Sequence, residues 1–465
     1  MTRELPWAWL LWICAGVVLA LTVHRQIFLY DNLYTAARDH AFFTQSLWNA
    51  IHGDGLRATI GKRSLHLFSE HAYVSHWFLA PFYALWPSPH LLMVIQALAL
   101  AVSGPALAAT ARYIGVSRAG AVMLGLLLLA QPSLHGAAVG LNTHGYHPDT
   151  LFPLFFLLAY GAWLGRRRRL FYVLFILNLS ILEHYAVIWG AVGALWFLRG
   201  HRLDGAVVLG VALLWFAVAT MLVIPSFSSG SEPYYFSGLS LRLSDPILVE
   251  TAVDAAVYFA KLSIFFMLLP LGSILVLAVL PMLAIYAQAQ IVGYVVPLEL
   301  WSWHSCAVLP VMGVAAAETL ARMEKCWPQR VAVVPVVLAA GVILISAVST
   351  SKVYQYPVSV LSAERRAELY RLEREIPEGA SLSATNFVAA HFSNRRSLYH
   401  FPAIRDAQYV LVDTRQRWGL TEPDRAALSD LRRSSQYELL SDIAGFELFH
   451  RGQGRVRGPY EHSGS

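Results

Sequence analysis

The sequence predicts an all-α membrane protein with about eleven transmembrane helices, followed by a small α/β domain at its C-terminal end. Of its 465 residues, 57% are hydrophobic and only 14% are charged, whereas a soluble domain has roughly 25% charged residues. The apolar residues form long runs, and a helix needs about 20 such residues to cross the hydrocarbon core of a bilayer. Beyond about residue 351 the composition becomes that of a soluble domain. The region before about residue 351 is therefore predicted to lie in the lipid bilayer.

Eleven apolar segments are the predicted spans: 8–28, 88–112, 119–134, 149–165, 170–183, 185–199, 204–224, 256–271, 272–290, 303–321 and 331–349. The first is predicted to be an uncleaved helix because no small-residue cleavage site follows it. Glu183 and His184 interrupt the apolar stretch 170–199. That stretch is either two short helices or one long tilted helix. A single helix would reverse the sidedness of every later span.

Positive charge indicates the orientation of the spans. Arg166–Arg169, the pair Arg199 and Arg202, and Arg322–Arg330 all lie between predicted spans, as expected for cytoplasmic loops. This placement puts the N-terminus inside and the C-terminal domain outside. The net charge of +6 is explained by these loops, so a nucleic-acid partner is not expected.

Two domains are predicted, a transmembrane domain over 1–350 and a soluble domain over 351–465. The transmembrane domain has a large first outer loop at 30–88, where aromatic and apolar residues recur every three or four positions and predict interfacial helices. The soluble domain contains the helix-like AERRAELYRLEREIP, the strand-like ASLSAT and AQYVLVD, and the hairpin-like YELLSDIAGFELFHR. These patterns predict a small α/β fold.

Histidines collect at the predicted outer ends and loops. They are His24, His40, His52, His66, His71, His76, His90, His135, His144, His147, His184 and His304. Ionisable groups at membrane depth usually mark a site or a water-filled cavity. The alternative is that histidine simply favours interfaces.

Two groups of residues have a spacing suited to a metal ion: Glu70-His71 followed by His76, and His144-x-x-His147 with Asp149 two positions further on. A zinc or manganese site needs three or four converging ligands, and neither group contains a recognised signature such as HExxH. A divalent metal ion is therefore an open alternative. Its candidate ligands are Glu70, His71, His144 and His147.

A carboxylate follows the first predicted span. Asp39 lies where the chain leaves the membrane beside aromatic residues, and a carboxylate held near a reacting hydroxyl acts as a general base. The alternative is a solvated loop aspartate, and Asp31 is a rival for the same role.

Several motifs carry a family resemblance. They are DHAFFTQSLWNAIHGDG, SEHAYVSHWFLAPFYALWPSPHLLMVIQALAL, NTHGYHPDTLFPLFFLLAYGAW, LEHYAVIWGAVGALWF, WSWHSCAVLPVMGVAA, IPEGASLSATNFVAAHFSNRRSLYHFP and AQYVLVDTR. In this order they resemble a family of uncharacterised bacterial predicted membrane proteins. That family is similar to the GT-C superfamily, integral-membrane glycosyltransferases that take sugars from polyprenyl-phosphate donors. A bacterial cytoplasmic membrane is the implied location.

The resemblance implies that Asp39 is the catalytic carboxylate, because it matches the position soon after the first transmembrane helix. It also singles out residues expected to bind substrate: Gln45, Trp48, Asn49, His71, His147, Glu183 and His304. The chain departs from its relatives at Thr44 and around Glu70-His71, where a nearby proline is also missing. Thr44 stands where they usually have an acidic residue, and Glu70-His71 stands where they have an Asp-His pair.

The implied function is inverting sugar transfer from a polyprenyl-phosphate donor to an extracytoplasmic acceptor. Lys62, Arg63, His71, His147 or a bound metal ion would neutralise the departing phosphate. The alternative from another class is a transporter or flippase. Transporters commonly place their site near the midplane on pseudo-symmetric helices, whereas this sequence has no visible repeat. A scaffold or sensor, in which the C-terminal domain binds a partner, is a third alternative.

Overall fold

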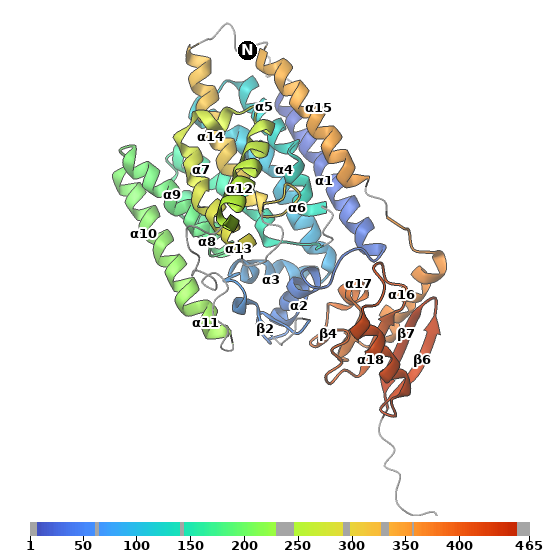
Figure 1. The fold of residues 1–465 in the computed structure, drawn as a ribbon. Coiled ribbons are helices and arrows are strands. Elements are labelled where there is room, and N and C mark those ends of the chain that lie inside the picture. The colour runs from blue at the N-terminus through green and yellow to red at the C-terminus, as the bar shows by residue number, and fades with distance from the viewer. Residues whose placement is uncertain are drawn as a thin grey trace, which may run out of the picture.

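The computed structural model describes residues 7–60, 65–139, 144–228, 246–291, 298–326, 334–355 and 358–452. Figure 1 shows a bundle of helices with a small sheet at one end of it. Helix α1 (Trp7–Asp31) runs along the bundle, and its C-terminal end lies beside the sheet region.

The helices of the bundle follow α1 in chain order. They are α2 (His40–Ile51), α3 (Ser75–Leu85), α4 (Pro89–Ile114), α5 (Arg118–Leu129), α6 (Pro132–Val139), α7 (Phe152–Leu164), α8 (Arg168–Ile181), α9 (Tyr185–Leu198), α10 (Arg202–Val218), α11 (Ile224–Phe227), α12 (Pro246–Phe265), α13 (Leu280–Ile291), α14 (Ser305–Cys326) and α15 (Val334–Tyr354). A short hairpin of β1 (Arg57–Ala58) and β2 (Leu65–His66) lies between α2 and α3.

Within the described ranges, six helical stretches are long and apolar enough to cross a membrane: Trp9–Asp31, Pro89–Ile114, Arg118–Val139, Arg202–Phe227, Ile274–Ile291 and Ser305–Cys326. Shorter apolar helices cover Pro148–Leu164, Tyr185–Leu198 and Gly341–Ser351. The predicted count of about eleven spans is therefore not confirmed. Length and charge explain the difference, because α8 has only 14 residues and α12 carries Glu250, Asp254 and Lys261.

The apolar stretch 170–199 is two helices. Helix α8 ends at Ile181 and α9 begins at Tyr185. Glu183 and His184 therefore lie in the break between two helices, and both are buried there. The break places two ionisable groups next to the segment that connects α1 to α4.

Helix α4 is the centre of the bundle and contacts α1, α5, α7 and α14. It begins after Ser88, whose hydroxyl accepts the N–H of His90, and ends at Gly115, whose φ of 104° suits the left-handed cap of a helix. Gly104 of α4 and Gly125 of α5 face each other, and a Cβ at Gly104 would lie 2.9 Å from the Gly125 carbonyl oxygen. Small residues allow this close approach of two apolar helices.

The sequence prediction of a small sheet region near the C-terminus is confirmed. The strands are β3 (Leu382–Ala384), β4 (Leu398–His400), β5 (Tyr409–Asp413), β6 (Tyr437–Ile443) and β7 (Phe446–Arg451), and the helices are α16 (Ala363–Glu375), α17 (Asn386–Ala389) and α18 (Glu422–Arg433). The strand order is β4-β3-β5-β7-β6. Strand β3 is parallel to both of its neighbours, and the other pairs are antiparallel. The β6–β7 hairpin turns at Ala444 and Gly445, which both have positive φ as this turn requires.

Candidate functional site

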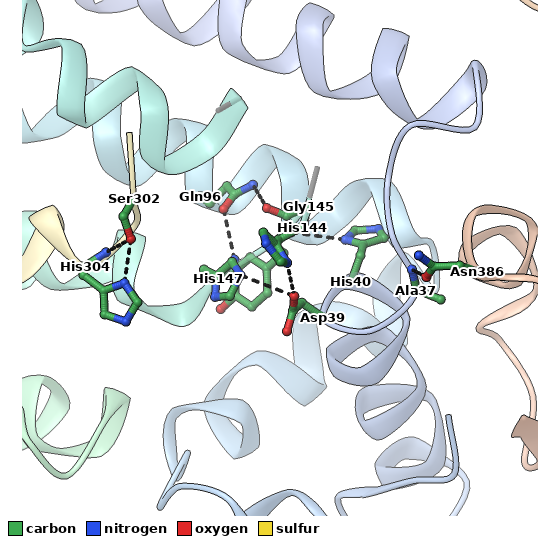
Figure 2. A network of polar contacts seen from close by, with 11 residues as sticks. Ala37, Asp39, His40, Gln96, His144, Gly145, His147, Ser302, His304 and Asn386 are labelled. Carbon is green, nitrogen blue, oxygen red and sulfur yellow. Dashed lines mark hydrogen bonds and ion pairs between the residues drawn. The ribbon is translucent and has the colours of Figure 1, made fainter. Parts of the chain in front are cut away.

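Asp39, His144 and His147 form one group, named here the Asp39 cluster. His144 donates a short hydrogen bond from Nδ1 to Oδ2 of Asp39, and Nε2 of His147 lies 3.9 Å from the same oxygen. Figure 2 shows both histidines directed at the carboxylate. The side chains of Asp39 and His144 are 23% and 29% exposed, whereas that of His147 is 8% exposed. The side chain of Asp39 is therefore partly exposed.

Residues from distant parts of the chain hold the two histidines. The ring of His147 stacks on Trp303, with 3.7 Å between ring centroids and 9° between planes. Its backbone N–H donates to Oε1 of Gln96 in α4, and Gln96 donates to the Gly145 carbonyl. Gly145 has a φ of 79°, and a Cβ at this position would lie 2.7 Å from Cβ of His40. Glycine is therefore needed where the chain passes between the two histidines.

The charge state of Asp39 follows from its contacts. Burial on its own would raise the pKa of Asp39, but the hydrogen bond from His144 lowers this pKa below its ordinary value. Burial also lowers the pKa of His147 to about 3. At neutral pH the carboxylate is ionised and the His147 imidazole is neutral.

A second group, named here the Glu183 cluster, contains His71, Glu183 and His184. Nδ1 of His71 donates to Oε1 of Glu183 at 2.8 Å, and the backbone N–H of Ala72 donates to Oε2 at 3.0 Å. Nδ1 of His184 lies 3.4 Å from Oε1. Glu183 is fully buried, and His71 is 23% exposed. The carboxylate thus ties the α1–α4 connection to the break between α8 and α9.

The Glu183 cluster fixes a positive charge. Burial alone would lower the pKa of His71, but the charge of Glu183 and its hydrogen bond raise the pKa above the ordinary value of histidine. The charges of Glu70 and Asp149 act in the same direction. His71 is therefore favoured as an imidazolium.

Aromatic rings separate the two clusters. Phe43 contacts the rings of Tyr73 and His147, at 5.3 and 6.2 Å between centroids, and Tyr73 contacts His71 at 5.1 Å. The clusters are thus neighbours across two rings. Next to them, the hydroxyl of Tyr185 donates to Oδ1 of Asp149 at 2.8 Å.

Other predicted residues lie near the clusters but outside them. His304 is bonded through Nδ1 to the Ser302 hydroxyl at 2.6 Å, and its ring contacts Trp303. Glu70 is exposed and belongs to neither cluster. His76 packs against Phe43. Two predicted phosphate-binding residues, Lys62 and Arg63, lie outside the described residues.

The structure does not bring Gln45, Trp48 and Asn49 to Asp39. The Gln45 amide donates to the Arg395 carbonyl at 3.1 Å, and its Oε1 accepts the Thr59 N–H at 2.8 Å. Asn49 donates to the Arg57 carbonyl at 2.8 Å, and Trp48 stacks on His52. The Gln45 side chain therefore connects α2 to Thr59 and to the sheet region, and the Asn49 side chain connects α2 to β1. Substrate binding by these three side chains stays a prediction.

Sequence reasoning missed Gln96, Trp303 and Tyr185 as parts of the site. A glutamine inside an apolar span is a signal for Gln96, because polar groups at membrane depth need partners. Trp303 lies beside His304 in a recognised motif, but only the fold shows that it stacks on His147. No sequence signal pairs Tyr185 with Asp149.

The fold is similar to that of a solved membrane protein. The crystal structure of ArnT from Cupriavidus metallidurans bound to undecaprenyl phosphate matches with a TM-score of 0.54 at 12% sequence identity. The match covers 96% of this chain and 99% of the ArnT chain. At this identity the likeness is one of fold, and it agrees with the architecture that the sequence motifs predict.

No curated protein sequence matches the chain. A family model described as "Predicted membrane protein (DUF2079)" matches residues 29–448. This range includes both clusters and almost all of the sheet region. It begins within α1 and ends within β7. The family resemblance indicated by the motifs is confirmed, and the chain belongs to this DUF2079 family of predicted membrane proteins.

Proposed function

We propose that this protein is a membrane glycosyltransferase that moves a sugar from a polyprenyl-phosphate donor to an acceptor hydroxyl outside the cytoplasmic membrane. One observation carries the proposal. Asp39, a partly exposed carboxylate whose pKa is lowered, accepts a hydrogen bond from His144. The similarity of fold to ArnT, a protein crystallised with undecaprenyl phosphate, supports a polyprenyl-phosphate substrate.

The geometry suits Asp39 as the general base. Oδ2 faces the two histidines, and among the described residues no hydrogen bond reaches Oδ1. Oδ1 would take the proton of the acceptor hydroxyl. The acceptor oxygen then forms a bond to the anomeric carbon, and the bond from this carbon to the phosphate oxygen breaks. The phosphate leaves with the electron pair, and the configuration is inverted.

The leaving phosphate needs positive charge rather than a strong acid. The imidazolium of His71, held by Glu183, would stabilise the charge that develops on the phosphate oxygens. Lys62 and Arg63 precede His71 in the same connection between α1 and α4, and they are proposed to act with it. His147 and His304 would contact the sugar or the phosphate.

The sheet region completes the site from outside the bundle. Asn386 accepts the N–H of Ala37 at 3.0 Å (Figure 2), and Ala37 precedes Asp39 by two residues. The hydroxyl of Thr59 donates to the Leu398 carbonyl at 2.7 Å. These contacts support the proposal that the sheet region lies on the same side of the membrane as the acceptor.

The test compares the wild type with Asp39→Asn. Transfer from radiolabelled polyprenyl-phosphate sugars is measured in membranes that contain each protein. Loss of a general base lowers the rate by about 10²- to 10⁴-fold, and this loss is the expected result. Asp54→Asn is the matched control, because Asp54 lies in the same connection but pairs with the exposed Arg396.

Full transfer activity in the Asp39→Asn variant would contradict the role of Asp39 as the general base. A wild type that transfers no sugar from any polyprenyl-phosphate donor would contradict the enzymatic function. Movement of the lipid across proteoliposomes without product would replace the proposal by transport.

A further inference from the structure

We propose that the Asp39 cluster is a binding site for one divalent transition-metal ion of the zinc type. Oδ2 of Asp39, Nδ1 of His144 and Nε2 of His147 all lie within 4.8 Å of one another. Two imidazoles and one carboxylate are a ligand set that zinc accepts in catalytic sites, where a fourth position stays open. The exposure of Asp39 and His144 leaves that position reachable.

A buried nitrogen points to a missing ligand. Nε2 of His147 is buried and has no hydrogen-bond partner in the described part of the chain. Leaving a buried polar group unpaired costs about 1–3 kcal/mol. A metal ion between His147 and Asp39 would satisfy this nitrogen. The residue as a whole is only 6% exposed, so bulk water is a poor substitute.

One of the ligand distances fits after a small movement, whereas the hydrogen bond between His144 and Asp39 has to open to admit the ion. Zinc bonds of about 2.0–2.1 Å place two ligand atoms roughly 3.4 Å apart in a tetrahedron. Nε2 of His147 and Oδ2 of Asp39 are 3.9 Å apart. A cavity of about 20 Å³ borders His144, His147 and Trp303, which is room for one water molecule or ion.

Neighbouring residues fix the orientation of the candidate ligands. Trp303 stacks on His147 and contacts His144 at 4.8 Å between centroids, and Gln96 fixes the backbone between them. Fixed outer contacts of this kind are typical of metal sites. The Glu183 cluster is less suited to a metal ion, because both oxygens of its fully buried carboxylate accept hydrogen bonds, whereas Asp39 accepts one at Oδ2 only, among the described residues.

A bound ion would act as a Lewis acid on the donor phosphate or on the acceptor hydroxyl. This role rests on the proposed function, whereas binding of the ion does not. The two ideas are therefore tested by different measurements.

The experiment uses the full chain, purified in detergent without a histidine tag and stripped with a chelator. Co²⁺ is added as a spectroscopic probe, and bound metal per chain is measured together with the visible absorption of four- or five-coordinate Co²⁺. The variants are Asp39→Asn, His144→Gln and His147→Gln. His52→Gln, an outer-loop histidine stacked on Trp48, and His71→Gln are the controls.

Wild type and both controls are expected to bind one ion, and each cluster variant is expected to bind at least about tenfold more weakly. Thermal unfolding in the same detergent identifies any variant that fails to fold, and His144→Gln, at the partly exposed ligand, is the variant expected to fold best. A folded wild type that binds no ion would overturn the site. Binding lost in His71→Gln but kept in His147→Gln would also overturn it.

Activity distinguishes the two proposals. An ion that binds as expected to a protein with no transferase activity would contradict the proposed function and leave the site intact. Full transfer by the metal-free protein would remove the catalytic role of the ion while retaining the enzyme.

Discussion

The two clusters contain the same residue types, one carboxylate and two histidines, but they differ in burial. The Asp39 side chain is 23% exposed and meets its histidines at one oxygen. Glu183 is fully buried, and both of its oxygens accept hydrogen bonds. A satisfied buried carboxylate holds segments together, whereas an accessible one remains available to a ligand. The comparison therefore predicts a ligand-binding role for Asp39 and a positioning role for Glu183.

The largest effect is expected from Glu183→Gln. This change removes the negative charge from a buried ion pair and leaves His71 without its counter-charge, which costs about 3–5 kcal/mol. The free energy of unfolding in mixed micelles measures the loss. Asp39→Asn is the matched variant in the other cluster and is expected to cost less than about 1 kcal/mol, because its partner is partly exposed. Equal losses of unfolding free energy in the two variants would contradict the expected difference between the clusters.

Gly145→Ala is expected to damage the Asp39 cluster selectively. The new Cβ would lie 2.7 Å from Cβ of His40 on a backbone with a φ of 79°, and strain of this kind costs about 1–3 kcal/mol. The displaced His144 and His147 should bind Co²⁺ more weakly. Gly53→Ala is the control for backbone strain without a steric clash, because Gly53 has a φ of 87° and no atom lies within 4 Å of a new Cβ. Unchanged Co²⁺ binding by Gly145→Ala would show that the cluster tolerates the shift.

The pH dependence of stability should differ between the clusters. The pKa of His71 is raised in the folded protein, so its contribution is fully present below the ordinary value of about 6.5 and is lost as pH rises through the raised value. The pKa of Asp39 is lowered, so its contribution is lost only as pH falls below about 4. The stability difference between wild type and His71→Gln should therefore shrink from pH 6 towards pH 9.

That difference is expected to be at most about 1.5–3 kcal/mol, the contribution of a hydrogen bond to a charged group. Chemical unfolding at several pH values measures it. A difference that grows with pH would show that Glu183, Glu70 and Asp149 do not hold His71 protonated.

The smallest effect is expected from Trp303→Leu. The substitution removes the ring that stacks on His147, and such a ring pair contributes about 0.5–1.5 kcal/mol. Stability should fall by this amount, while Co²⁺ affinity falls through poorer orientation of His147. Trp418→Leu, at a tryptophan that is 69% exposed, is the control. If both variants bind Co²⁺ like the wild type, Trp303 has no positioning role.

Local patterns predicted much of the fold. The apolar run 88–112 corresponds to α4, and the pattern YELLSDIAGFELFHR corresponds to the hairpin of β6 and β7. These patterns did not predict the number of spans, because an apolar run does not show where a helix ends, and α8 has only 14 residues.

The site was predicted less completely because its contacts are distant in the sequence. Asp39 and His144 are 105 positions apart, and neither the His-x-x-His spacing nor the carboxylate reveals its partner. Gln45 belongs to the same motif as Asp39 but bonds to Arg395, 350 positions away. Residues of one sequence motif therefore have different partners in the fold: Asp39 bonds to His144 in the site, whereas Gln45 bonds to the sheet region.

The hydrogen bond from Ala37 to Asn386 has a consequence for biosynthesis. A ribosome adds about 5–20 residues per second, so Asn386 is made roughly 20–70 s after the segment that it holds. During this interval the loop that carries Asp39 lacks one of its anchors. Chains that stop before the sheet region would therefore lack this anchor, and the proposed site would be held by all of its contacts only in copies that contain Asn386.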